Sequence, residues 1–187
     1  MQEQLAGIVQ SLESAQSRLR RLTDQLSESD WNRRPAANRW SAAECVEHLN
    51  LTSRAYIPLL RDAIANAGEA RRDPTKHYRH DALGWFLSKM FGPLRHLGRF
   101  KVGRVKTTPA FVPRPGRSRT EILSDFVRLQ AELVSLVRSA DGLPVNDVKI
   151  VSPFGGRMRY NAWSALVIVS RHEHRHLEQA EEAAHGG

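Results

Sequence analysis

The sequence predicts an all-α protein, a four-helix bundle with one long crossover that contains a basic insertion. Three observations support this fold class. Apolar residues recur at steps of three and four along four long segments of the 187-residue chain. About fifty residues separate the second of these segments from the third, and strand-like alternation is scarce. A bundle with one long connection accommodates that spacing.

The first predicted helix lies near the N-terminus. Its apolar stripe comprises Leu5, Ile8, Leu12, Ala15, Leu19, Leu22 and Leu26. The stripe ends near Ser27 to Asp30, and a turn-like stretch with Pro35 and two asparagines leads on to Trp40. We therefore expect irregular chain between the first and second helices.

The second predicted helix begins at Ser41. Ser41 and Glu44 have capping-box spacing, so each side chain can satisfy a free backbone N–H at the helix start. The helical pattern fades by Gly68. Because Pro58 has no backbone N–H, we expect it to kink the later part of this helix or to leave that part irregular.

The connection over residues 70–118 breaks the helical pattern. A short helix is expected from about Asp81 to Phe91, where Gly92 and Pro93 stop it, and the proline-rich chain beyond is expected to be irregular. The segment holds twelve Lys and Arg against two acidic residues, a net charge of +10, whereas the rest of the chain carries −2. The basic character of the chain therefore belongs to this insertion alone.

Two further helices complete the predicted bundle. Ser118 and Glu121 repeat the capping-box spacing before a stripe that ends near Gly142. Residues 147–159 are expected to form a loop or a short hairpin. Asn161 is a suitable cap for a fourth helix, from Ala162 to about Ala184. We expect residues 1–187 to form a single domain, with the insertion at about 70–118.

Composition favours a cytoplasmic location. Cys45 is the single cysteine, so no intrachain disulfide can form, which fits a reducing compartment. The first residues lack the basic start and apolar run of a signal peptide. No stretch approaches the roughly 18 uncharged apolar residues of a membrane span.

Three histidines fall within five positions on the predicted fourth helix. His172 and His176 are four residues apart, so both lie on its apolar face, one turn from each other. His174 points roughly the opposite way, and we expect it to be exposed. Its neighbours on that side are charged residues: Arg171, Arg175 and Glu178.

The histidine pair suggests a metal site. Two imidazoles at this spacing can reach one ion, but catalytic zinc-type sites usually have three protein ligands and an open position. His48 is the natural third ligand, because it lies on the core stripe of the second helix and bundle interiors commonly hold such sites. The alternatives are a chance surface pair and a hydrogen-bonded core histidine.

Residues 172–176 also match the HExxH string of zincin metalloproteases. The strand-rich surroundings of a zincin and its third downstream ligand are missing, so we interpret this match as a coincidence. The sequence identifies no general base. Glu44, one turn before His48, and Gln179, three residues after His176, are candidates to lie just outside the ligands. Cys45 either approaches the metal or is a buried, inert thiol.

Two motifs resemble the DinB/YfiT-like superfamily of bacterial four-helix-bundle proteins. WSAAECVEHL, Trp40 to Leu49, is similar to the W-S-x-x-E-x-x-x-H-L segment of that family, and HEHRHLEQ, His172 to Gln179, to its H-x-x-x-H-x-x-Q helix. The proline-rich TTPAFVP, Thr107 to Pro113, is also similar. The motifs occur in the expected order along nearly the whole chain.

This resemblance implies a function. It implies that His48, His172 and His176 bind one divalent metal ion, commonly zinc or nickel. Some members of the family use low-molecular-weight thiols as isomerases or transferases, and others are described as metal-dependent hydrolases. A bound ion can serve either chemistry, because it lowers the pKa of a bound water to about 7 and stabilises a thiolate.

The alternative is a non-catalytic binding or dimerisation module. Its basic insertion would contact nucleic acid, an anionic membrane or a partner protein, and a homodimer is compatible with the apolar residues there. Apolar residues interleaved with Lys89 and Arg95 resemble an interfacial helix: Trp85, Phe86, Leu87, Met90, Phe91 and Leu94. These residues could equally cover the end of the bundle or a dimer partner.

Overall fold

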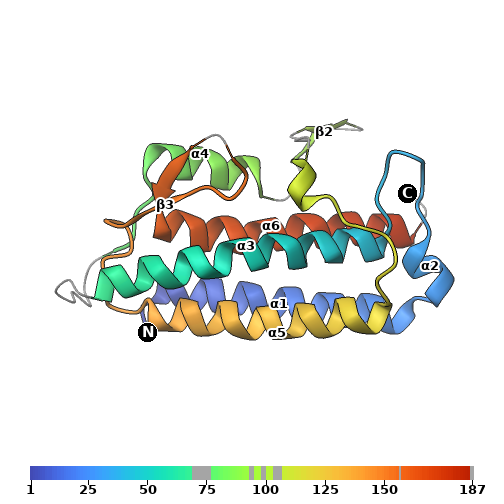
Figure 1. Cartoon of the computed structure of the whole chain (residues 1–187), viewed down its shortest axis with the longest axis horizontal. Helices are drawn as coiled ribbons and strands as arrows, with labels where there is room; N and C mark the ends of the chain where they lie inside the picture. Colours follow the sequence, from blue (N-terminus) through green and yellow to red (C-terminus); the bar gives the residue numbers. More distant parts are fainter. Residues whose placement is uncertain (69–76, 93–94, 98–99, 103–106, 156, 186–187) are drawn as a thin grey trace.

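Four long helices form a bundle, as predicted (Figure 1). They are α1 (Glu3–Gln25), α3 (Ala42–Gly68), α5 (Arg119–Ser139) and α6 (Ala162–Ala184). The computed structural model describes residues 1–68, 77–92, 95–97, 100–102, 107–155 and 157–185. Part of the basic insertion, Leu94 included, lies outside the described residues.

Interhelical contacts fix the direction of each helix. Arg54 of α3 pairs with Asp125 of α5, and seven residues further along both helices Arg61 pairs with Glu132, so α3 and α5 run parallel. α1 and α6 are also parallel, since Ser11 bonds to Ser170 and Arg18 to Glu181. The chain must therefore return along the whole bundle between α3 and α5, which explains the long crossover.

The crossover lies along the bundle and contains short elements. They are α4 (Ala82–Met90), β1 (Arg95–Leu97), β2 (Phe100–Val102) and the 3₁₀ turn η1 (Pro109–Phe111). α4 agrees with the predicted short helix, and the Asp81 carboxylate caps it by accepting from the Gly84 N–H at 2.8 Å. β1 pairs antiparallel with β2, and η1 is a short regular turn within the proline-rich chain that was predicted to be irregular.

A second hairpin precedes α6. β3 (Lys149–Val151) pairs antiparallel with β4 (Arg159–Asn161), which agrees with the hairpin alternative for this segment. Tyr160 on β4 is fully buried, and its hydroxyl lies 2.6 Å from that of Tyr56 on α3. Asn161 then caps α6 by accepting from the Ser164 N–H at 2.9 Å, as predicted.

The structure differs at two places from the expectation of irregular chain. α3 remains helical through the exposed Pro58 as far as Gly68, so its later part is not irregular. The stretch after α1 is not all irregular, because it contains α2 (Glu28–Asn32). Ser27 caps α2, and α2 places Trp31 in the core with no exposed surface.

The apolar core is divided into two clusters along the bundle. One contains Tyr56 to Ala67 of α3 and Ala162 to Val169 of α6, and the other contains Ala42 to Leu49 and Leu177 to Ala184 of the same helices. The α6 residues between the clusters are mostly polar and buried: Ser170, His172, Glu173, Arg175 and His176. The middle of the bundle is therefore a buried polar layer. None of the helices in the described part of the chain combines the length and the apolarity needed to cross a bilayer.

Glu173 lies in this layer and is held by α5. It is 2 % exposed, and its Oε2 accepts from the Gln130 Nε2 at 2.8 Å. Burial raises the pKa of Glu173 to about 8. An isolated buried carboxylate is costly, so the acid is mainly protonated in the folded protein at pH 7.

Replacement of Glu173 by Gln should stabilise the metal-free protein at neutral pH. Because the pKa of Glu173 is raised in the folded state, its contribution to the stability of the wild type is lost as the pH rises from about 4.5 through 8. The neutral amide of the Gln variant does not titrate, so that variant does not lose stability in this way. The difference in free energy of unfolding between Glu173→Gln and wild type should grow by roughly 3 kcal/mol from pH 4.5 to pH 7. Urea denaturation at each pH, with chelator present, measures it. The same replacement at the exposed Glu13 is the control, and an equal pH trend there would contradict the assignment.

Candidate metal centre

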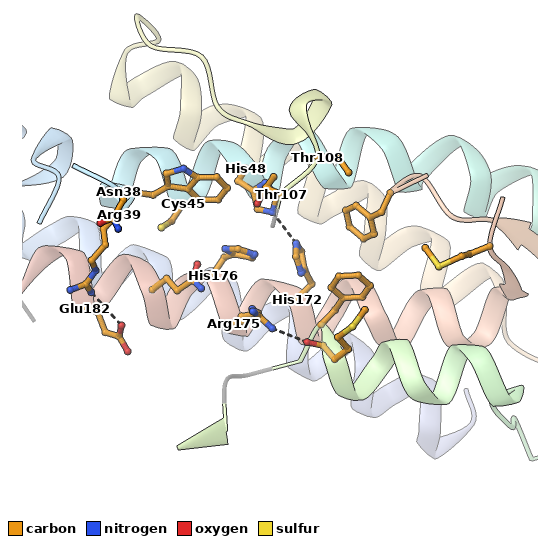
Figure 2. A pocket seen from close by; sticks show the side chains of 16 residues that line it. Asn38, Arg39, Cys45, His48, Thr107, Thr108, His172, Arg175, His176 and Glu182 are labelled. Carbon is orange, nitrogen blue, oxygen red and sulfur yellow. Dashed lines mark hydrogen bonds and ion pairs between the residues drawn. The ribbon is translucent and has the colours of Figure 1, made fainter. Parts of the chain in front are cut away.

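The structure brings His48 of α3 together with His172 and His176 of α6 (Figure 2). All three side chains are buried, and one ring nitrogen from each lies within 4.8 Å of those of the other two. The Nε2 atoms of His48 and His172 are 3.1 Å apart. Such a separation allows both atoms to reach one ion at the roughly 2.0–2.1 Å typical of zinc–imidazole bonds.

The crossover fixes the orientation of His48. The Nδ1–H of His48 donates to the backbone carbonyl of Phe111 at 2.7 Å, in a buried contact. A carbonyl can only accept, so the Nε2 of a neutral His48 carries the lone pair and faces His172. Histidine ligands of metals are commonly held in this way by a hydrogen bond from the second ring nitrogen.

The three imidazoles are neutral at physiological pH. Burial lowers the pKa of His48 to about 4, and burial also lowers the pKa values of His172 and His176 well below their ordinary value. The positive charge of Arg175 acts in the same direction on all three. Neutral imidazole is the form that binds metals, so protons compete weakly for this site.

The proton positions leave a buried lone pair without a donor. If His172 carries its proton on Nε2 and donates to His48, then its buried Nδ1 accepts from nothing. If the proton is on Nδ1, two lone pairs face each other across 3.1 Å. The Nδ1 of His176 is also buried without a partner. A cation removes this mismatch, so the residues present fit a metal ion.

A cavity of about 380 Å³ opens beside the histidines. Aromatic rings flank the imidazoles on two sides: the Trp40 ring centroid lies 4.9 Å from that of His48, and those of Phe154 and Phe91 lie 5.7 Å and 6.0 Å from that of His172. The other residues that line the cavity are Asn38, Arg39, Cys45, Met90, Thr107, Thr108, Met158, Arg175, His176, Gln179 and Glu182. The site therefore has room for a small molecule.

The other predicted site residues have different positions. Gln179 lines the cavity, and its side chain raises the pKa of His176 against the larger effect of burial. Glu44 is not among the lining residues, because its carboxylate accepts from the Ser41 N–H at 2.9 Å and pairs with Arg34. Cys45 lines the cavity, and burial raises the pKa of its thiol, which keeps it protonated.

The prediction that His174 is exposed was wrong. Its Nε2 lies 3.0 Å from the Ser11 hydroxyl of α1, and the ring is half-buried. Arg175, expected on the same charged face, is 5 % exposed, and its Nη1 donates to the Met90 carbonyl at 2.7 Å. The physical reason is that α1 and α4 cover faces of α6. The apolar periodicity of α6 alone assigns these faces to solvent.

The position of Glu173 in the structure agrees with the interpretation of the HExxH match as a coincidence. Glu173, which would be the zincin base, is directed toward Gln130 and does not line the cavity. Sequence reasoning missed the cavity walls formed by Phe91, Phe154 and Met158, which come from the crossover and from the β3–β4 hairpin. It also missed the Phe111 carbonyl, because a backbone acceptor leaves no residue-type signal.

Comparison with known proteins agrees with the earlier resemblance. No curated protein and no solved structure gives a significant match to the chain. The family model of the DinB superfamily matches residues 11–180, which include the three clustered histidines and all four long helices apart from the ends of α1 and α6. The chain therefore belongs to the DinB superfamily.

Proposed function

We propose that His48, His172 and His176 bind one divalent metal ion, most suitably zinc or nickel, and that the protein is a metal-dependent enzyme. The observation that carries this proposal is the buried imidazole lone pair that has no donor in either tautomer of His172. When bound, such an ion supplies a Lewis acid that lowers the pKa of a water or thiol. The adjacent cavity of about 380 Å³ has the size of a small-molecule site.

Two reaction classes are compatible with this centre, hydrolysis and thiol-dependent transfer or isomerisation. Metal-dependent hydrolysis is commonly assisted by a carboxylate base that positions and deprotonates water. Among the described residues that line the cavity, Glu182 is the only acid, and it lies 3.6 Å from Arg39 in an ion pair. This shortage of bases favours chemistry in which a low-molecular-weight thiol supplies the nucleophile.

Metal content tests the centre. Protein purified without a histidine tag should retain about one divalent ion per chain, whereas His48→Ala and His176→Ala should retain almost none, because two imidazoles rarely suffice. His174→Ala is the matched control, since His174 lies on the same helix but contacts Ser11. Elemental analysis after dialysis measures the difference. Equal metal in all four proteins would end the proposal.

Chelation should also lower the melting temperature. An ion that binds only the folded state stabilises it by mass action, so removal should shift Tm by about 5–10 °C when free metal is roughly a hundredfold above its Kd. The shift should occur in wild type and His174→Ala and should vanish in His48→Ala. Far-UV circular dichroism establishes that each variant is folded.

The thiol hypothesis has a spectroscopic test. Addition of a small thiol such as dithiothreitol to cobalt-substituted protein should produce a thiolate-to-metal charge-transfer band. Cys45 also lines the cavity, so the experiment includes Cys45→Ser, in which the band should persist. If the thiol gives no band while the protein cleaves simple esters, hydrolysis is the correct class.

A contact function of α4 is the second candidate. Trp85 and Phe86 are 55 % and 56 % exposed, next to the exposed Lys89, while Leu87 and Phe91 pack into the core. Exposed aromatic and basic residues suit an anionic membrane, nucleic acid or a second copy of the chain. Replacement of Trp85 and Phe86 by Ser should abolish any sedimentation with anionic vesicles, retention on DNA or dimerisation that the wild type exhibits. A wild type that remains monomeric and binds neither would exclude this function.

A further inference from the structure

The outer face of α4 is largely apolar although it is exposed to solvent. α4 lies on the outside of the bundle, against α6 (Figure 1). Its exposed residues recur at helical spacing and therefore share one face, which we call the α4 patch: Ala82, Trp85, Phe86 and Lys89. Trp85 and Phe86 are each more than half exposed, so two large aromatic side chains are in contact with water.

The opposite face of α4 is packed closely on the bundle. Gly84 approaches α6 so closely that a Cβ there would collide with the Ser164 hydroxyl. Leu87 is buried in the core, and Arg171 of α6 donates from its Nε to the Ser88 carbonyl at 2.8 Å. Because these contacts fix the rotation of α4 about its axis, the aromatic side chains of the patch cannot turn inward without breaking them.

The chain that forms α4 and continues from it is strongly basic. Residues 82–106 contain no acidic residue and six basic ones: Lys89, Arg95, Arg99, Lys101, Arg104 and Lys106. Strand β4, which contacts α4, adds the exposed Arg159. Exposed aromatic rings within an excess of positive charge are complementary to a surface that is both anionic and partly apolar.

A membrane with anionic phospholipids has both properties. Aromatic rings prefer the boundary between headgroups and acyl chains, while basic residues beside them are attracted to anionic headgroups. Duplex nucleic acid would use the positive charge but not the rings, because its phosphates and base edges are contacted chiefly by charged and polar side chains. A symmetric dimer would bury the rings but would bring the basic segments of two copies together, and like charges repel.

We propose that the α4 patch binds the surface of a membrane that contains anionic phospholipids. Trp85 and Phe86 enter the headgroup boundary, Lys89 contacts lipid phosphates, and α4 lies parallel to the membrane plane. This inference rests on the contact function proposed above for α4 and names its partner. It does not depend on the metal ion, since none of the patch residues lines the cavity beside the histidines.

Sedimentation with vesicles tests the proposal. Wild type should partition about tenfold more strongly onto vesicles of phosphatidylcholine and phosphatidylglycerol than onto vesicles of phosphatidylcholine alone, and added salt should weaken this binding. Trp85→Ser/Phe86→Ser should lose most of the binding to the mixed vesicles, and Lys89→Glu should weaken it several-fold. The matched controls are Val127→Ser, which removes a similarly exposed apolar side chain from α5, and Arg21→Glu, which changes the net charge equally on α1.

Tryptophan fluorescence locates the contact. Trp85 is the most exposed of the four tryptophans, since Trp31 and Trp163 are buried and Trp40 is partly buried. The mixed vesicles should shift the emission of wild type to shorter wavelength, and brominated acyl chains should quench it. Trp85→Phe keeps an aromatic ring, so it should still bind the mixed vesicles but without this shift.

The proposal is overturned if wild type binds both kinds of vesicle equally or binds neither, or if the two controls lose as much binding as the patch variants. Retention on duplex or single-stranded DNA, or dimerisation, that disappears in Trp85→Ser/Phe86→Ser without vesicle binding would retain the contact function and assign it to that other partner. Absence of all three interactions would overturn the contact function as well. Far-UV circular dichroism and a metal content equal to that of wild type establish that the patch variants are folded and that the metal centre is unaffected.

Discussion

The antiparallel contact between α3 and α6 is the constraint on which the rest of the structure depends. It sets His48 of one helix against His172 and His176 of the other, and it joins Tyr56 to Tyr160 where α6 is about to begin. His172 and His176 lie between the two apolar clusters on α6, and His48 lies beside Leu49 near the end of one cluster on α3, so apolar packing fixes the helices around the polar layer. The imidazoles are thus held by apolar burial, with few bonds of their own.

That constraint has an electrostatic consequence. The packing that excludes water also lowers the pKa values of the three histidines and raises that of Glu173. All four groups are neutral in the folded protein at pH 7, while Arg175 retains its charge. In the polar layer, the Arg175 cation therefore lies on one side of α6 and the protonated Glu173 lies on the other side.

The four helices of the bundle and the meeting of the three histidines could be predicted because local patterns determine them. Stripes at helical spacing mark the buried faces, and Ser118 and Asn161 mark helix starts through bonds to residues three positions on. Contacts that depend on the short helices α2 and α4 were beyond such reasoning. Trp31 is buried because α2 folds back on the bundle, and Arg175 is buried because α4 covers it. No periodic pattern in the sequence around either residue predicts which helix buries it.

Because α3 and α5 run parallel, the site is built partly from the bundle helices and partly from the crossover between them. The histidines belong to the bundle, whereas Met90, Phe91 and the carbonyl of Phe111 belong to the crossover that this arrangement makes necessary. The crossover joins opposite ends of the bundle and is separate in sequence from the two helices that hold the histidines. Substitutions in the crossover can therefore alter the wall of the cavity and leave the helical segments that carry the histidine cluster unchanged.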